Sequence, residues 1–550
     1  MLCNKYLPRK GIGPHRGSHV KNYRRCIPTS TLLSLHSLKG SHEYEAGPDI
    51  DWLATWKCFC PPALGGLLFG YDIGVSGGAL VSLTSSSSSG TEWGPSLDSL
   101  MTGLVVGSSL MGALISSLSV LFLGGDKYGR KTELLGAAGL YSAGSLLMGT
   151  AYTLPMLLAG RCFYGLGIGL AMHSSPAYIA ETSPSSVRGL LISCKEVSIV
   201  AGILLGYFLS DVVGDASEGW RLMYAAVMPL SVVLGVGMAL LPESPRWLLL
   251  SRKEDAAVNE ALKKVLGRVA QGSSGKQILR HQLDEMKKSL PAASSNLERI
   301  SRVHDADEAS SVQQVKDGTS VQLSQVSGGI GSSSTVSQLF LQERFRRPLL
   351  IGASLMLYQQ VTGQPSVLYF ATKLFKDSGL SLGDAEGISV LIGVFKLAMT
   401  LAAVSLVDRV GRRPLLLFGV SGMVLALILL SFSSSLSSNE ASFGQMLPSV
   451  SALLLFVGCY QVSFGPISWL IVGEIFPLEV RSQAIAVATV TNFGSNFMVS
   501  LILPGMQNSF GLSATYQCFA AVGVIALASI YFTVPETKGK TLEEIEAMWH

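Results

Sequence analysis

The sequence predicts an all-α membrane protein in which twelve transmembrane helices form two pseudo-symmetric six-helix halves. Three observations carry this prediction. The 550-residue chain is 48% hydrophobic and only 14% charged, whereas soluble domains carry about a quarter charged residues. Its apolar stretches recur at about the 20 residues that a helix needs to cross a bilayer. Polar motifs between these stretches occur twice along the chain, in the same order.

Each predicted span is a predominantly apolar stretch of near-bilayer length. The twelve spans are 60–81, 98–122, 133–152, 155–175, 190–211, 222–241, 347–370, 384–405, 414–434, 448–472, 482–504 and 513–534. They divide the chain into a basic polar tail (1–58), a first half (59–241), a linker (242–346), a second half (347–534) and a C-terminal tail (535–550). Helical patterning predicts short helices in the first part of the linker, and its Ser- and Gly-rich part is predicted to be disordered.

The repeated motifs lie after even-numbered spans, which places them on one side of the membrane. An Asp-x-x-Gly-Arg motif follows the second and eighth spans, a Glu…Pro…Arg motif the fourth and tenth, and a Pro-Glu motif the sixth and twelfth. The paired positions are Asp126 and Asp408 at an offset of 282 residues, and Glu181 and Glu474, Pro242 and Pro535 at an offset of 293. Because these loops are basic, the positive-inside rule makes this side cytoplasmic, together with both tails and the linker.

The N-terminal tail permits two interpretations. Eight Lys and Arg residues precede its first acidic residue, Glu43, and Ser and Thr cluster between 29 and 37. This composition is typical of an organelle transit peptide. A disordered cytoplasmic tail that obeys the positive-inside rule would have the same composition.

Several function classes are excluded by what the sequence lacks. The net charge of +4 is too small to indicate a nucleic-acid partner. The eight Cys show no metal-ligand spacing and no disulfide framework. No nucleophile triad or phosphate-binding loop is present, and the glycines between 165 and 169 suit close helix packing. The sequence therefore predicts no enzyme, no cofactor and no metal site.

Asp72 is the residue on which the functional interpretation depends. It is the only charge in the apolar run from about 60 to 80. A carboxylate inside a membrane span is costly and requires a partner, water or a proton, so it marks a functional site by default. A proton is the obvious species for it to carry.

The motifs resemble those of the sugar porter branch of the major facilitator superfamily over about 59–545. The resemblance rests on five motifs in order, namely Phe69–Asp72, Gly160–Gly169, Pro242–Arg246, Tyr358–Gly363 and Pro535–Gly539. Within the branch the chain is most similar to plant and algal D-xylose-proton symporter-like members, whose relatives include plastid and vacuolar glucose transporters. The runs 363–369 and 465–470 indicate this subgroup.

The resemblance implies a proton-coupling group made of Asp72, Arg161 and Glu196. Arg161 cannot deprotonate, so it would hold Asp72 ionised until a proton releases the pair. A static buried ion pair is the alternative. Glu196 stands where the branch usually has Gln, which predicts a sugar contact first and a second proton site next, with Lys195 as a local counter-ion.

The resemblance also implies a set of sugar-binding residues, namely Phe69, Glu196, Gln359, Gln360, Tyr369, Trp469 and Asn492. Amides suit a ring of hydroxyls, and a Trp face stacks on a sugar ring. Adjacent glutamines diverge by about 100° on a helix, so a break near Gly363 is expected. The alternatives are helix–helix contact for the amides and for Asn496, an interfacial position for Trp469 and simple packing for Phe69. Pro365 replaces a usual Asn, and a contact from Gln461 is in doubt.

A cytoplasmic salt-bridge network is the last implied site. It would join the halves in the outward-facing state through paired acids and arginines. Its predicted members are Asp126, Arg130, Glu181, Arg188, Glu243, Arg246, Asp408, Arg412, Glu474 and Arg481.

These observations predict a proton-coupled monosaccharide symporter that works by alternating access, with hexoses such as glucose ahead of xylose. A facilitative uniporter and a non-transporting sugar sensor are the alternatives. The expected partners are the sugar, the proton and the bilayer, and a single chain suffices for the mechanism. No Asn-x-Ser/Thr sequon occurs, which favours a plastid envelope or vacuolar membrane over the plasma membrane.

Overall fold

The fold is that of a computed structural model of the whole chain. The structure describes residues 50–85, 88–123, 128–184, 187–251, 255–271, 275–289, 339–370, 372, 382–436, 443–477, 480–540 and 542–549. Most of the predicted N-terminal tail and the Ser-rich part of the linker lie outside these residues. Within them, all regular secondary structure is helical.

The first half contains six membrane-crossing segments. They are α2 (Trp52–Thr84), α3 (Ser99–Leu123), α4 (Arg130–Gly149), α5 (Leu154–Thr182), α6 (Arg188–Val213) and the pair α7 (Gly219–Ala225) and α8 (Val227–Leu240). Short helices follow, namely α9 (Pro245–Leu250), α10 (Asp255–Leu266), the 3-10 helix η1 (Gly267–Gln271) and α11 (Gly275–Ser289). They lie in the stretch predicted as the cytoplasmic linker.

The second half repeats this order. It contains α14 (Glu343–Val361) with α15 (Gln364–Tyr369), α17 (Leu382–Val410), α18 (Arg412–Leu436), α19 (Phe443–Val462) with α20 (Phe464–Ile475), and α21 (Arg481–Thr533). The short helix α22 (Leu542–Ala547) follows on the cytoplasmic side. Nine of the described helices are long and apolar enough to cross a membrane by length and composition, and the arrangement is the predicted fold of twelve transmembrane helices.

Several spans are interrupted, and two of the interruptions shape the centre of the molecule. Gly363 separates α14 from α15 with a φ of +97°, a left-handed conformation that favours glycine. Ser463 separates α19 from α20, just before Gly465 and Pro466. The break near Gly363 was predicted. Gly511, with a φ of +81°, turns α21 back on itself.

Within the first half, α2 and α6 approach so closely that their backbones touch at glycines. A Cβ atom on Gly70 would lie 1.8 Å from the Ile199 carbonyl oxygen, and one on Gly202 would lie 2.0 Å from the Leu67 carbonyl oxygen. Gly74 and Gly206 continue the two rows one turn further on. Small residues at i and i+4 on both helices allow this approach, which large side chains would prevent.

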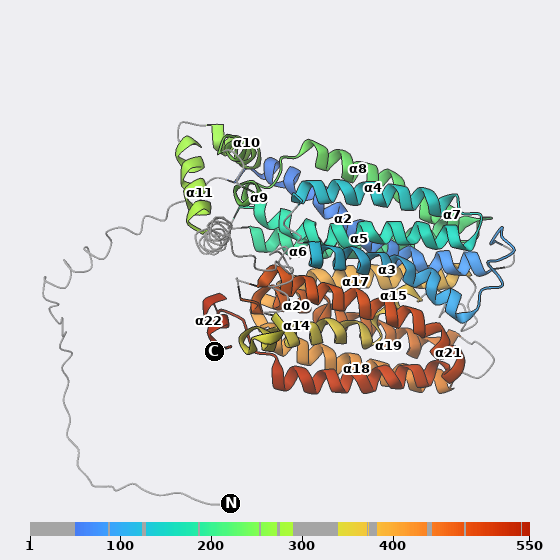
Figure 1. Cartoon of the computed structure of the whole chain (residues 1–550). Helices are drawn as coiled ribbons and strands as arrows, with labels where there is room; N and C mark the ends of the chain where they lie inside the picture. Colours follow the sequence, from blue (N-terminus) through green and yellow to red (C-terminus); the bar gives the residue numbers. More distant parts are fainter. Residues whose placement is uncertain are drawn as a thin grey trace, which may run out of the picture. The chain divides into compact units, whose positions relative to one another are not determined.

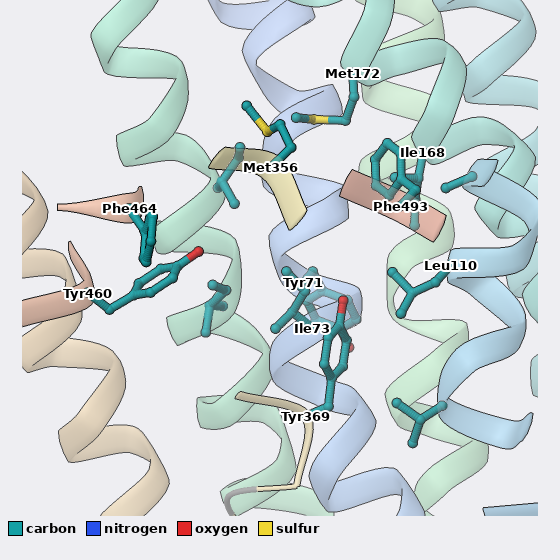
Figure 2. Packing of buried hydrophobic residues seen from close by; sticks show 14 of the residues in the cluster. Tyr71, Ile73, Leu110, Ile168, Met172, Met356, Tyr369, Tyr460, Phe464 and Phe493 are labelled. Atoms are coloured by element: carbon teal, nitrogen blue, oxygen red, sulfur yellow. The ribbon is translucent and has the colours of Figure 1, made fainter. Parts of the chain in front are cut away.

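The two halves meet along a seam formed mainly by α3 with α21, α6 with α17, and α2 with α15 (Figure 1). Figure 2 shows apolar side chains around this seam, with Tyr71 and Ile73 of α2 beside Tyr369 of α15. The Phe69 and Phe493 rings meet edge to face at 5.9 Å across it. This packing surrounds a polar cavity in the middle of the molecule.

Candidate functional site

The central cavity lies between the two halves. It has a volume of about 70 Å³, which holds only a few water molecules, so it must widen to admit a monosaccharide. The first half contributes α2, α5 and α6, and the second contributes α14, α15, α17, α19, α20 and α21. The polar lining residues are Glu196, Gln359, Gln360, Gln364, Lys396, Tyr460, Gln461, Trp469, Asn492 and Asn496.

Asp72 and Arg161 form a buried ion pair behind the cavity wall. The Arg161 Nη1 atom lies 3.2 Å from Asp72 Oδ1, and the two residues are 0% and 2% exposed. The Ser109 hydroxyl donates to the other carboxylate oxygen at 2.7 Å. Arg161 also donates to Ser76 and to the Val106 carbonyl oxygen. The structure thus brings together the two predicted coupling residues, while Ile73, the neighbour of Asp72, lines the cavity.

Glu196 lies on the cavity wall with its predicted local partner. The Lys195 ammonium lies 3.5 Å from Glu196 Oε1, and the Glu196 side chain is 20% exposed. The same ammonium lies 6.0 Å from the centre of the Trp469 ring, which belongs to the opposite half. Glu196 therefore has a counter-ion on its own helix and still presents a carboxylate to the cavity.

Gln359 and Asn492 form a short hydrogen-bonded chain on the cavity wall. The Asn492 amide donates to Gln359 Oε1 at 2.6 Å, and Gln359 Nε2 donates to the Phe464 carbonyl oxygen at 2.8 Å. That carbonyl belongs to the first residue of α20, directly after the break between α19 and α20. Gln359 therefore ties the broken helix to α14 and α21.

Three other glutamines leave hydrogen-bonding capacity inside the cavity. The amide oxygens of Gln360, Gln364 and Gln461 are buried and accept no hydrogen bond from any residue that the structure describes. Buried polar groups are normally paired, because an unpaired one costs about 1–3 kcal/mol. These three oxygens are therefore suited to a ligand that brings several hydroxyl donors.

The predicted aromatic residues occupy different places. Trp469 and Phe69 line the cavity, and Phe69 also packs on Phe493. Tyr369 is fully buried at the seam and is not part of the lining, but it lies close enough to Asp72 and Arg161 to interact with them electrostatically. Tyr369 therefore lies nearer to the buried ion pair than to the predicted sugar position.

Five polar lining residues were not predicted as sugar contacts, namely Gln364, Lys396, Tyr460, Gln461 and Asn496. Gln461, whose contact was in doubt, lies on the cavity wall, and so does Asn496, for which helix–helix contact was the equal alternative. Lys396 of α17 was not considered at all. It is the only charged residue between 387 and 407, so the rule that singled out Asp72 applied to it equally.

The cytoplasmic charge clusters repeat between the halves. Arg130 lies 3.6 Å from Glu181 in the first half, and Arg412 lies 3.1 Å from Glu474 in the second. Glu243 accepts from the Lys131 backbone amide, as its counterpart Glu536 does from those of residues 412 and 413. Each of these contacts closes within its own half.

The backbone amides that donate to Glu536 lower the pKa of its carboxyl group. Burial raises the pKa of its carboxyl group, but hydrogen bonds from four backbone amides, including those of Lys538 and Arg412, outweigh burial and hold the pKa below 4.5. The carboxylate therefore stays ionised at the end of the last span.

The remaining members of the predicted network are placed as follows. Arg188 and Arg481 donate to the carbonyl oxygens of Ser183 and Phe476, which cap the preceding helices. Arg246 is exposed. Asp126 and the side chain of Asp408 lie outside the described residues.

Two six-helix halves around an occluded polar cavity define a membrane transporter, a class that binds its substrate near the bilayer midplane between structural repeats. The family model described as "Sugar (and other) transporter" matches residues 58–549. The chain belongs to this family, the sugar porters of the major facilitator superfamily, and is a transporter rather than an enzyme.

Individual relatives agree with this assignment. The chain is 44% identical over 510 residues to the "D-xylose-proton symporter-like 3, chloroplastic" protein of Arabidopsis thaliana, covering 92% of this chain and 84% of that one. It is 31% identical to the "Arabinose-proton symporter" of Bacillus subtilis (strain 168) over 497 residues, 89% of this chain and 94% of that one. The solved proton:xylose symporter XylE, bound to 6-bromo-6-deoxy-D-glucose, superposes with a TM-score of 0.67 at 27% identity, covering 90% and 99% of the two chains.

Proposed function

We propose that this transporter is a proton-coupled monosaccharide symporter that works by alternating access. Its substrate is a hexose such as glucose, with xylose as the second candidate. The observation that carries the proposal is the buried Asp72–Arg161 pair directly behind the sugar cavity. Several relatives with proton-symporter names support the proton as co-substrate.

The proton step follows from the surroundings of Asp72. Its carboxylate is held by Arg161 and Ser109, and removing one partner of a buried pair costs about 3–5 kcal/mol. Protonation removes the charge without removing the side chain, so it weakens the bond between α2 and α5. A proton can therefore shift the balance between two arrangements of the helices that border the cavity.

The sugar step follows from the polar lining. The amide oxygens of Gln360, Gln364 and Gln461 can accept hydrogen bonds from sugar hydroxyls. The hydrogen bond between Asn492 and Gln359 holds these two lining side chains in place. The Trp469 ring offers a face on which a sugar ring can stack. These groups belong to the second half, whereas Glu196 belongs to the first. A bound sugar therefore bridges the halves and favours closure of the cavity around it.

The test is uptake of radiolabelled glucose and xylose into proteoliposomes, with a proton gradient imposed and then collapsed, for the wild type and Asp72→Asn. We expect the variant to lose gradient-driven accumulation while retaining sugar exchange, which needs the cavity but no gradient. Retained exchange also shows that the variant is folded.

Two other outcomes would select the alternatives. Uptake that ignores the gradient in both proteins would make this a facilitative uniporter, with a structural role for Asp72. If the folded wild type moves neither sugar, the substrate assignment fails and the sugar sensor becomes the better interpretation.

The proposed location is an organelle membrane, the plastid envelope or the vacuole. A relative with a chloroplast name and the basic, Ser-containing N-terminus support it. Fluorescent fusions at the C-terminus, with and without residues 1–49, test this proposal. Fluorescence of the full chain at the plasma membrane would contradict it.

A further inference from the structure

Lys396 is a buried cation in the cavity. The proposed transport mechanism gives this residue no role. Its residue exposure is 3%, and it lines the cavity from α17 of the second half. Its ammonium lies 5.5 Å from the centre of the Tyr460 ring, a contact that offsets only part of the cost of burying a charge. Among the residues that the structure describes, no carboxylate lies within 4.0 Å of it.

The compensating charge is Glu196, on α6 of the other half. Its carboxylate is the one charged group that acts on Lys396 electrostatically in the described structure, but it is already paired with Lys195 at 3.5 Å. Asp72 and Arg161 neutralise each other behind the wall. The cavity region thus holds two ammonium groups and one carboxylate, an excess of one positive charge.

We propose that Lys396 forms an anion-accepting subsite, so that the cavity takes monosaccharides bearing a carboxylate, such as hexuronates, and rejects amino sugars. This proposal rests on the sugar cavity of the proposed function and names a further class of substrate for it.

The lining of the cavity supports such a substrate. A sugar carboxylate beside Lys396 supplies the counter-ion that the protein lacks, and a charge pair shielded from water is worth more than the same pair at a surface. The sugar hydroxyls remain free to donate to Gln360 and Gln461. A neutral sugar presents a hydroxyl oxygen to the same ammonium, so hexoses also fit.

An ammonium on the sugar would meet the opposite situation. Among the described lining residues the only carboxylate it can meet is Glu196, whose charge Lys195 already neutralises, and the Lys396 ammonium repels it. Whether the cavity prefers acidic sugars or amino sugars therefore depends on the net charge of its lining. Single substitutions can change this net charge by one unit.

The test is equilibrium binding of radiolabelled D-glucuronate and D-glucose to the purified full-length protein, with D-glucosamine as a competitor. We expect Lys396→Gln to weaken glucuronate binding at least about tenfold, the lower end for a shielded charge pair. Glucose binding should weaken only about threefold, as for one neutral hydrogen bond. Glu196→Gln removes one negative charge and so raises the net charge of the cavity by one unit. It should therefore strengthen glucuronate binding relative to glucose binding. The double variant restores the wild-type net charge and should return this ratio toward the wild type.

Two control variants separate charge from shape and folding. Lys396→Arg keeps the charge and should retain the preference for glucuronate over glucosamine even if both affinities fall. Lys57→Gln removes an exposed lysine at the cytoplasmic end of α2 and should change nothing. The proposal is overturned if the wild type binds no glucuronate, or if Lys396→Gln weakens both sugars equally. Glucuronate binding by a wild type that shows no proton-driven uptake would leave this inference intact while refuting the proposed symport.

Discussion

Gly70→Ala tests whether the close packing of α2 on α6 holds the first half together. The added Cβ atom would lie 1.8 Å from the Ile199 carbonyl oxygen, and an ordinary contact needs at least 3.4 Å, so the helices must separate by about 1.6 Å. The obstacle is backbone, which cannot swing aside as a side chain can. Overpacking of this kind costs about 1–3 kcal/mol.

We expect the melting temperature of the detergent-purified protein to fall by about 2 °C, as about 2 kcal/mol implies for a unit of roughly 500 residues with an unfolding entropy of about 2.1 cal/mol/K per residue. Gly139→Ala is the matched control, because nothing lies within 4 Å of its added Cβ atom. Alanine also favours a helix over glycine by about 1 kcal/mol, so the control should melt at or above the wild type. Equal melting of the two variants would refute the packing argument.

Two further predictions concern the ends of the second half and the cavity wall. Glu536→Gln should lower stability by about 1 kcal/mol at pH 7. Because the folded pKa is below the ordinary 4.5, the carboxylate stabilises the fold above that value. The melting difference between wild type and variant should therefore shrink as the pH falls below it, and a constant difference down to pH 3 would contradict the stated cause. Gln359→Leu removes the oxygen acceptor of the Asn492 amide and the side-chain donor to the Phe464 carbonyl oxygen, so glucose affinity should fall about tenfold in binding assays. An unchanged affinity would show that this chain of hydrogen bonds does not organise the site.

The arrangement of twelve spans could be predicted because hydrophobic length and repeated loop charges are local properties of the sequence. The boundaries were less accurate. α2 begins at Trp52 rather than near 60, because Asp51 caps the helix by accepting from the amides of Leu53 and Ala54. Pro61 and Pro62 lie inside it, although prolines usually end a helix.

The candidate site was predictable in part. An isolated carboxylate in a span identified Asp72 from physical principles alone, but its pairing with Arg161, 89 residues away, came from the family resemblance. Sequence spacing could not show that Tyr369 lies outside the cavity lining or that Gln461 lies within it. Such placements depend on how helices from the two halves rotate against each other, and no local pattern encodes that rotation.

Lys396 was missed although its signal was present. The predicted sugar contacts came from the family resemblance, which implies mainly glutamines and aromatic residues. A plain search for charges inside apolar spans would have found it together with Asp72. The structure adds that this lysine and Glu196, from different halves, line the same cavity.

The turn at Gly511 has a consequence for biosynthesis. The last two spans were predicted as separate segments, and α21 consists of two helices that are joined directly at Gly511 within Arg481–Thr533. The Asn508 amide donates to Ser99 of α3 next to the turn. Without a long polar loop between them, the two segments are suited to leave the translocon together as a helical hairpin. Their backbone hydrogen bonds would be complete before lipid surrounds them, as the membrane interior requires.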